Sequence, residues 1–483
     1  MKKIWSLVSG LLLIATPCYA QAVVMVAGGG SEGDIGDTTS WSYRLYPHLL
    51  DGGDVNGDGR ITVAVLANSP QSSFIPQYFK WLGADDAFNV IIASRDQANN
   101  AGTVDAVRGV DAIFIKGGDQ GVYYDLWNGT RLEDNIRYVV QTLNGGIGGT
   151  SAGAMSQSQY AFAGGKDLIS LDILTNAQTP YLNDTDGGSG IHNDFLGFVT
   201  GSVIDSHFND RGRLARLLGI MAKAQSDYQL STLLGIGLGD QTGLAIHGNS
   251  AQVIGVGSVT FAQPTPQTVV HRPAGAPLYL TNIRADVLTE GWSFDLTSRV
   301  VTNRPADALP VSYAGDSAAN KNALTIDGSK KPQERSYALK ASYYPQGYSL
   351  TPTPSSTDIL NSIGLNDSQN SNNRGYIQET ILRALYDHPD YSGILLSVGG
   401  KITRAQNSPD LLSFGPGSGG PESAAVIFDG EQVSAKSLSP YVSTSDSGNG
   451  SLHSAALENL RVHVLGQTSI WGTKYDSRDH DLQ

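Results

Sequence analysis

The sequence predicts an α/β protein in which a mostly parallel sheet carries helices on both faces. Continuous apolar runs alternate with helical patterns through the first half of the chain, and such runs are typical of parallel strands buried on both sides. Three of these runs end in glycine-rich stretches. Because ligands bind at the carboxyl ends of strands in such sheets, these ends predict a functional site.

The predicted elements follow one another in a regular order. Strands are expected at residues 23–27, 61–66, 90–92 and 112–115, helices at residues 74–82 and 131–143, and a short glycine-rich strand directly before Ser151. After about residue 248 the strands become short and alternating, and residues 303–373 are rich in Ser, Asn, Pro and Asp. This change predicts a β-rich C-terminal part with long loops.

An internal similarity lies within that β-rich part. Residues 280–288 recur as residues 457–465, and residues 243–253 are loosely echoed by residues 424–433. The recurrence predicts a decayed partial repeat. The alternative is that these are unrelated strands with a chance similarity.

The N-terminus has the composition of a secretory signal peptide. Two lysines precede an apolar run from Ile4 to Ala15, and small residues precede an expected cleavage site after Ala20. The apolar run is too short to cross a bilayer. We therefore expect a chain without a membrane span that is exported to the periplasm or the extracellular space.

Length and composition are those of a globular protein with two or three parts. Of the 483 residues, 16% are charged and 40% are hydrophobic. We expect a signal peptide over residues 1–20, a catalytic α/β domain over 21–302 and a C-terminal extension over 303–483. The net charge of −13 argues against a nucleic-acid partner. The only cysteine, Cys18, lies in the expected signal peptide, which excludes disulfides and cysteine catalysis in the mature chain.

The segment Gly149–Gly153 has the G-x-S-x-G pattern of a serine nucleophile and follows a predicted strand. Glycine on both sides of Ser151 permits the sharp turn that raises the hydroxyl above the sheet. The amide of Ala152, at the start of the next helix, can then face a developing oxyanion. The alternative is a glycine-rich turn with an incidental serine.

A serine nucleophile needs a base, and His207 is the best placed of the nine histidines. It ends a strand-like run, and its spacing from Asp205 predicts that the two side chains share one face of that strand. Asp240 also follows an apolar strand and can orient the imidazole. The resulting order is Ser, His, Asp. If the fold follows standard α/β-hydrolases, the base is instead His247 or His271, with Asp205 or Asp240 as the acid.

Two further groups of residues predict substrate contacts. The turn Gly117–Gln120 can supply a second oxyanion amide and a side-chain amide. Arg211, Arg213 and Arg216 follow the candidate base, and arginine binds carboxylates through two parallel hydrogen bonds. They predict a substrate that carries a carboxylate, whereas the alternative is a solvated helix face with internal salt bridges.

Two patterns resemble cofactor or metal sites but fit poorly. Residues 28–33 match the G-x-G-x-x-G pattern of dinucleotide sites, yet no clean apolar helix follows. Residues 54–59 begin like a calcium loop, but the twelfth position is Val65 instead of an acidic ligand. We therefore expect no cofactor and no metal in the reaction, and a tight Asp/Gly turn at residues 54–59.

Four blocks of this sequence resemble the serine peptidases that include cyanophycinase and aspartyl dipeptidase. They occur in the family's order between about residues 23 and 302, and they are Gly117-Gly118-Asp119-Gln120, Gly148 to Ala154, Asp205-Ser206-His207-Phe208 with Arg211-Gly212-Arg213, and Gly237-Leu238-Gly239-Asp240. The resemblance implies a sheet similar to that of glutamine amidotransferases. It also implies Ser151 as nucleophile, His207 as base and Asp240 as the acid.

Within that family the sequence is most similar to extracellular cyanophycinases. They cut cyanophycin, a poly-aspartate backbone with arginine on each side-chain carboxyl, into β-Asp-Arg dipeptides. The resemblance implies an oxyanion hole at Gly118 and Ala152, and substrate contacts from Gln120, Asp205, Arg211, Arg213 and Arg216. Asp119 and Ser206, in the same blocks, are further candidates for substrate binding. The sequence departs from the family's pattern at Ser206, where Gln is common, and at Asp240, where Glu is common.

These observations predict a secreted serine peptidase that acts through an acyl-enzyme on Ser151. Two alternatives remain at this point. One is another aspartyl or isoaspartyl peptidase, or an esterase, that uses the same serine. The other is a non-catalytic protein that binds the polymer. A homodimer is a further expectation.

Overall fold

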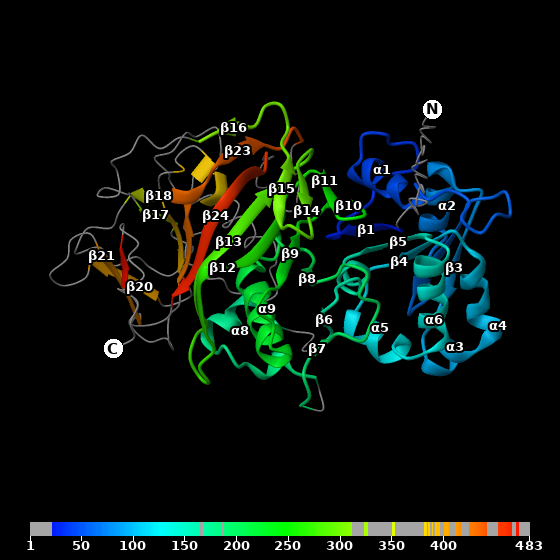
Figure 1. The fold of residues 1–483 in the computed structure, drawn as a ribbon, viewed down its shortest axis with the longest axis horizontal. Helices are drawn as coiled ribbons and strands as arrows, with labels where there is room; N and C mark the ends of the chain where they lie inside the picture. Colours follow the sequence, from blue (N-terminus) through cyan, green and yellow to red (C-terminus); the bar gives the residue numbers. More distant parts are fainter. Residues whose placement is uncertain are drawn as a thin grey trace, which may run out of the picture.

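The computed structural model describes residues 22–164, 168–184 and 187–311, and shorter segments between residues 323 and 472 (Figure 1). These segments are 323–326, 350–352, 381–383, 385–386, 389, 392–396, 400–404, 411–416, 425–441, 453–465 and 470–472. The expected signal peptide over residues 1–20 and most of the loops expected over 303–373 lie outside the described residues.

Short helices dominate the helical content of the described residues. They are α1 (Trp41–Leu45), α2 (Phe74–Leu82), α3 (Arg95–Asn99), α4 (Ala101–Val104), α5 (Gln120–Trp127), α6 (Arg131–Arg137), α7 (Ala152–Met155), α8 (Ser170–Thr175) and α9 (Leu214–Tyr228). Single turns of other helix types are η1 (Tyr46–Leu50), η2 (Asp105–Gly109), η3 (Tyr138–Thr142), η4 (Pro180–Leu182) and η8 (Gly430–Gln432).

Within the described segments, the strands fall into two large sheets and two small ones. Those before residue 310 are β1 (Val23–Ala27), β2 (Thr62–Ala67), β3 (Asp86–Ile91), β4 (Ala112–Ile115), β5 (Gly146–Thr150), β6 (Ala161–Phe162), β7 (Ile191–His192), β8 (Ser202–Asp205), β9 (Leu234–Leu238), β10 (Thr242–His247), β11 (Ser250–Gly255), β12 (Val259–His271), β13 (Tyr279–Leu288), β14 (Ser293–Asp295) and β15 (Val300–Asn303). Those that follow are β16 (Leu309–Pro310), β17 (Ala323–Ile326), β18 (Leu350–Pro352), β19 (Ser392–Leu396), β20 (Gly400–Arg404), β21 (Leu411–Pro416), β22 (Ala425–Asp429), β23 (Ala435–Leu438), β24 (Ala455–Leu465) and β25 (Ile470–Gly472).

The first sheet has the strand order β15-β14-β11-β10-β1-β5-β4-β2-β3. Strands β1, β5, β4, β2 and β3 run parallel to one another. Strands β10, β11, β14 and β15 extend the sheet in antiparallel pairing. The predicted α/β fold is therefore present, but the parallel arrangement is confined to one half of this sheet.

Helices cover both faces of the parallel half, because successive side chains of a strand point to opposite sides. Met25 of β1 packs in the core with Phe79 of α2, together with α1 and η1. The next residue, Val26, packs in the opposite core with Trp127 of α5 and Ile136 of α6. The continuous apolar runs of the sequence thus reflect strands buried on both faces.

The second sheet stands beside the first and contains strands from the middle and the end of the chain (Figure 1). Its order is β18-β17-β19-β22-β24-β13-β12-β9-β8, and β23 joins β16 to β24. Helix α9 packs on β8 and β9. Strand β8 ends at Asp205 and β9 leads to Asp240, so the candidate base and acid follow strands of this second sheet, whereas Ser151 follows β5 of the first.

The first pair of similar segments, residues 280–288 and 457–465, forms two adjacent antiparallel strands, β13 and β24. Arg284 lies opposite Arg461, which is the equivalent position of the other copy. The two segments are thus related by a local two-fold arrangement. The members of the second pair lie in different sheets. Residues 243–253 belong to the first sheet, whereas β22, within residues 424–433, belongs to the second.

The same two-fold relation holds for an irregularity in each strand. Asn282 and Asn459 occupy equivalent positions and both have a positive φ, 59° and 67°. The Asn282 N–H donates to His463 Nδ1 at 3.2 Å, and the Asn459 N–H donates to Asp286 Oδ1 at 2.8 Å. His463 and Asp286 are again equivalent positions. A side chain of each segment therefore accepts a hydrogen bond from the irregular backbone of the other segment.

Contacts cross the expected boundary at residue 302. The Trp292 indole N–H donates to Ser437 Oγ at 2.8 Å in a buried position. Strand β13, which ends at Leu288, also pairs with β24. The C-terminal strands therefore complete a sheet that begins within residues 21–302. Among the described helices, none combines the length and apolar character needed to cross a lipid bilayer.

Candidate active site

Ser151 lies in a sharp turn between β5 and α7. Its backbone angles, φ 52° and ψ −117°, are uncommon for a residue with a side chain. The Ser151 N–H donates to Ala27 O of β1 at 2.9 Å, which fixes the turn to the sheet. A Cβ on Gly149 would lie 2.4 Å from the carbonyl carbon of Gly153. A Cβ on Gly153 would lie 2.1 Å from Ile115 O of β4, so both glycines of the G-x-S-x-G pattern are required for this packing.

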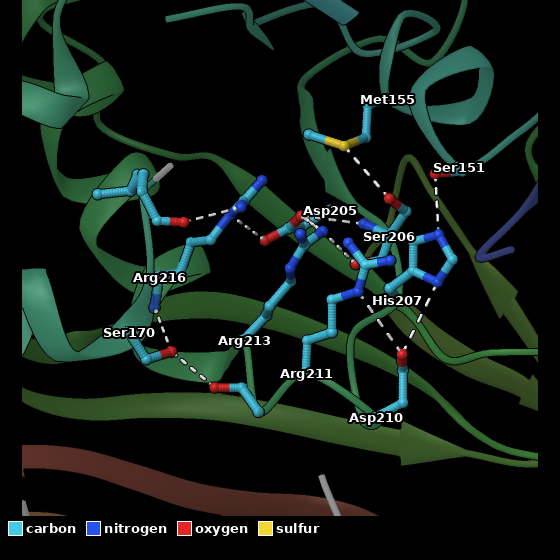
Figure 2. Close-up of polar contacts among 12 residues, drawn as sticks. Ser151, Met155, Ser170, Asp205, Ser206, His207, Asp210, Arg211, Arg213 and Arg216 are labelled. Carbon is cyan, nitrogen blue, oxygen red and sulfur yellow. Dashed lines mark hydrogen bonds and ion pairs between the residues drawn. The ribbon is translucent and has the colours of Figure 1, made fainter. Parts of the chain in front are cut away.

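His207 faces Ser151 from the loop after β8 (Figure 2). Its Nε2 lies 2.9 Å from Ser151 Oγ, which is hydrogen-bonding distance. Strand β8 ends at Asp205, and His207 has a φ of 46°. The chain therefore turns before His207, and the expectation that Asp205 and His207 share a strand face is wrong because the regular alternation ends at Asp205.

Two carboxylates flank the other nitrogen of the imidazole. Asp240 Oδ1 lies 3.2 Å from His207 Nδ1, and Asp210 Oδ2 lies 3.8 Å from it. The Ser151–His207–Asp240 contacts have the arrangement of a hydrolase triad. The sequence analysis did not single out Asp210, although its spacing of three residues from His207 was visible. Burial and the neighbouring Asp240 carboxylate raise the pKa of Asp210.

The glycine run after β1 makes room for these side chains. A Cβ on Gly29 would lie 2.2 Å from His207 Cε1, and one on Gly30 would lie 2.9 Å from Asp240 Oδ2. Both residues have a positive φ, 118° and 100°. The His207 N–H also donates to Gly28 O at 2.8 Å. The pattern that resembled a dinucleotide site therefore packs against the candidate base and acid.

A polar pocket opens beside Ser151. Its lining combines residues from both candidate glycine turns, from α7 and from the loop after β8: Gly118, Asp119, Gln120, Ser151, Met155, Ser206, Arg211, Arg213 and Arg216. Three of these residues are arginines, so the pocket attracts anions. The structure thus brings together most of the residues that the sequence analysis selected.

Asp205 differs from its expected place among the substrate contacts. It is fully buried and does not line the pocket. Its carboxylate pairs with Arg213 at 3.2 Å and with Arg216 at 3.0 Å (Figure 2). Burial, and then the charge of Arg213, lower the pKa of Arg216 to about 10. Asp205 therefore holds two cations at the base of the pocket. Arg213 and Arg216 line the pocket and also form internal salt bridges, but they do so on a largely buried surface instead of a solvated helix face.

Arg211 has a different environment from the other two arginines. Its side chain is 40% exposed, whereas that of Arg213 is 14% exposed. The Arg211 Nε lies 3.8 Å from Asp210 Oδ2, so Asp210 lies between a pocket arginine and the candidate base. Arg211 is the cation of this loop that incoming substrate reaches with the least desolvation.

The second glycine turn lies close to Ser151. A Cβ on Gly117 would lie 3.3 Å from Ser151 Cβ, so this turn approaches the serine closely. The Asp119 carboxylate caps α5 by accepting from the N–H groups of Gly121 and Val122. Asp119 thus stabilises this turn and the start of α5. Gln120 begins α5 and lines the pocket.

Ala152 supplies the other expected oxyanion donor. It is the first residue of α7, and the first N–H groups of a helix have no partner within that helix. Ser206, where the family commonly has Gln, donates to Met155 Sδ at 3.3 Å and lines the same pocket.

The structure excludes the two alternative bases. His247 pairs with Val23 at the amino end of β1, whereas Ser151 follows the carboxyl end of the neighbouring β5. His271 ends the 13-residue strand β12, whose first residue, Val259, pairs with Leu238 near the site. Both histidines lie a full strand away from Ser151.

The segment at residues 54–59 is a closed turn. Asp54 Oδ1 accepts from Gly57 N at 2.7 Å, and Asp54 Oδ2 accepts from Gly59 N at 2.7 Å. Asn56 Oδ1 accepts from Asp58 N at 2.9 Å. These side chains satisfy the backbone of their own turn, as the Asp/Gly turn interpretation predicts.

Comparisons with known proteins find cyanophycinases among the similar sequences. The chain is 30% identical to a cyanophycinase of Nostoc sp. over 230 residues, which are 46% of this chain and 70% of that protein. It is 27% identical to a cyanophycinase of Geminocystis herdmanii over 285 residues, 56% of this chain and 93% of that protein.

Other comparisons are weaker. No family model matches the chain. Among solved structures, a peptidase from an acI-B1 Actinobacterium has 17% identity and a TM-score of 0.34 over 57% of this chain and 97% of that chain. The match to the Nostoc protein, by its identity and its coverage, shows that this chain belongs to the cyanophycinase family of serine-type peptidases.

Proposed function

We propose that this protein is a secreted cyanophycinase that hydrolyses the poly-aspartate backbone of cyanophycin to β-Asp-Arg dipeptides. The observation that carries the proposal is the hydrogen-bonded series Ser151–His207–Asp240 beside a pocket with three arginines. Cyanophycin presents free carboxylates on its arginine residues, and Arg211 is exposed to receive one. The relatives from Nostoc and Geminocystis carry the same name in their descriptions.

The reaction follows from the positions of these groups. Ser151 Oγ forms a bond to the carbonyl carbon of an aspartyl peptide while His207 Nε2 takes the hydroxyl proton. The amides of Gly118 and Ala152 stabilise the oxyanion, and one such donor contributes about 3 kcal/mol to the transition state. The C–N bond then breaks, and the leaving amine takes the proton from His207.

Water completes the cycle. His207 accepts a proton from water, whose oxygen attacks the acyl carbon of the ester on Ser151. The ester C–O bond breaks, the proton returns to Ser151 Oγ, and the dipeptide leaves with a new carboxylate. Asp240 holds the imidazole in the required tautomer and stabilises its charged form in both steps.

A second substrate class is favoured by one observation. Ser206 replaces the glutamine that is common in the family and lines the pocket. The altered subsite fits other aspartyl or isoaspartyl peptides as well. The experiment below distinguishes the esterase and the non-catalytic interpretations from both peptidase candidates.

The test uses the mature protein with cyanophycin, beside Ser151→Ala. Mass spectrometry is expected to detect β-Asp-Arg from the unmodified protein, while Ser151→Ala binds polymer and loses at least 10³-fold in kcat. Dipeptide from Ser151→Ala at an unchanged rate contradicts the nucleophile. If neither protein releases dipeptide, isoaspartyl peptides and simple esters are tested next. Labelling of Ser151 by a serine-reactive phosphonate separates a peptidase on another substrate from a binding protein.

A further inference from the structure

A second cluster of titratable side chains lies at the end of the first sheet that is remote from Ser151. His48 and Asp51 belong to η1 and its C-terminal cap, and His247 ends β10. Val23 at the amino end of β1 pairs with His247, so this cluster is separated from the candidate active site by the length of the strand. Neither the peptidase mechanism nor the family resemblance uses these three residues.

The two imidazoles converge on one carboxylate oxygen. His48 Nδ1 lies 2.8 Å from Asp51 Oδ2, and His247 Nε2 lies 3.3 Å from the same oxygen. The two rings are perpendicular, with centroids 5.7 Å apart. The three ligand atoms all lie within 4.8 Å of one another.

The backbone on which these side chains stand is held in place by the core. In a 3-10 helix, residues three apart lie on the same side, which places His48 above Asp51. Tyr46 and Leu49 of the same turn are buried on the other side, and a Cβ on Gly146 of β5 would lie 2.2 Å from Leu49 O. The turn therefore cannot rotate its histidine away without disrupting the core.

These positions fit a transition-metal ion. Two imidazole nitrogens and one carboxylate oxygen favour Zn²⁺ or its neighbours over Ca²⁺ and Mg²⁺, which prefer oxygen ligands. A tetrahedral zinc ion with bonds of about 2.1 Å holds its ligand atoms about 3.4 Å apart. The distance from His247 Nε2 to Asp51 Oδ2 already has this value, and the shorter His48 contact must open by about half an ångström.

The cluster is also accessible and suitably charged. The side chains of His48, Asp51 and His247 are 30%, 43% and 47% exposed, which leaves the fourth direction open to water. With neutral imidazoles the cluster carries the single negative charge of Asp51, in a chain of net charge −13. Both features favour the capture of a divalent cation from solution.

We propose that His48, Asp51 and His247 form a zinc site with an open fourth position filled by water. The ion would join η1 to the end of β10 and would not take part in peptide hydrolysis. This proposal is independent of the substrate, because none of its ligands lines the pocket beside Ser151.

The test is a titration of the full-length mature protein with Zn²⁺, after treatment with a chelator and removal of any affinity tag. Isothermal titration calorimetry is expected to find one equivalent of zinc per chain at this site. The double variant His48→Ala/His247→Ala should bind at this site at least tenfold more weakly. His271→Ala is the matched control, because it removes an exposed histidine on the distant end of β12 and should bind zinc as the unmodified protein does.

A second possible zinc site must be separated from the first, since His207, Asp210 and Asp240 also lie within metal-binding distance of one another. Zinc at those residues would inhibit hydrolysis, whereas zinc at His48 and His247 should leave the rate unchanged. The proposal is overturned if the double variant retains the binding of the unmodified protein, or if the unmodified protein binds no zinc at a 1:1 ratio. Ca²⁺ at the same concentration is expected to give the same heat with the double variant as with the unmodified protein.

Discussion

At the scale of the residue, the candidate base is flanked by two acids with different geometry. Asp240 Oδ1 is 3.2 Å from His207 Nδ1 and Asp210 Oδ2 is 3.8 Å from it. Asp210 also faces Arg211. The shorter acid at Asp240, where the family commonly has Glu, is thus accompanied by a second negative charge. In the proposed mechanism, both charges stabilise the imidazolium that forms on His207.

The two acids are expected to respond differently to removal of their charge. Asp240→Asn should lower kcat by roughly 10³- to 10⁴-fold, because the hydrogen bond that fixes the imidazole tautomer is lost. Asp210→Asn keeps that bond and removes only a nearby charge, so kcat should fall about tenfold with little change in KM. Steady-state kinetics of both variants measure this difference.

The pH profile gives the second readout for Asp210. In the proposed mechanism the charge of Asp210 stabilises the transition state, so the loss of kcat/KM in Asp210→Asn should be seen where Asp210 is ionised in the unmodified enzyme. Because the pKa of Asp210 is raised by burial and by Asp240, this effect should fade at low pH, where Asp210 is protonated in the unmodified enzyme. A rise in KM with an unchanged profile would show that Asp210 acts only through Arg211.

At the scale of the element, the turns after the strands decide whether the site can form. The run Gly28–Gly30 follows β1 and makes space for the ring of His207 and the carboxylate of Asp240. The turn at Ser151 needs Gly149 for the close approach of β5 and α7, and Gly153 for the close approach of α7 to the end of β4. Glycine therefore appears at these places because any side chain would occupy the volume of a neighbouring backbone or of the candidate base.

Gly29→Ala and Gly36→Ala form a matched pair that tests this point. Both glycines have a positive φ, 118° and 100°, so each substitution strains the backbone and should cost about 1 kcal/mol of stability. Only the new Cβ at Gly29 meets a side chain, His207 Cε1 at 2.2 Å, and nothing lies within 4 Å at Gly36.

Activity should therefore separate the two variants much more strongly than stability does. Gly29→Ala is expected to lose most of its kcat, and Gly36→Ala should keep it. Urea unfolding and kinetics on the same preparations measure both quantities. Full activity in a folded Gly29→Ala variant would mean that His207 reaches Ser151 from another position.

At the scale of the whole molecule, the two large sheets depend on each other and on the C-terminal strands. The core around Val26 also contains Ile236 and Phe261 of the second sheet. Strand β13 pairs with β12 on one side and with β24 on the other. The loop that carries His207 therefore stands on a sheet whose central pairing is supplied by residues far beyond 302.

A chain that ends after residue 302 is expected not to reach a stable monomeric fold. It would expose the edge of β13 and leave the buried Trp292 indole N–H without Ser437. Circular dichroism and gel filtration should report loss of cooperative unfolding or aggregation, in contrast to the full-length chain. A monomeric and active truncated chain would show that the C-terminal strands are dispensable for the site.

The sequence by itself determined the local features of this protein. Apolar runs located β1, β2 and β4, the amphipathic pattern located α2, and the glycine spacing around Ser151 identified the nucleophile turn. His207 and Asp240 could be selected as well, because each follows a strand that ends in polar residues. Periodicity and turn chemistry are properties of neighbouring residues, so they can be read along the chain.

The tertiary structure alone decided which distant groups meet. It placed β8 and β9 in a second sheet, turned Asp205 into the buried partner of two arginines, and brought Asp210 beside the candidate base. It also paired β13 with β24 across 170 or more residues of sequence and gathered His48 with His247. These outcomes depend on which strands become neighbours and which charges share a buried space, and those contacts are set by the packing of the whole chain rather than by any local pattern.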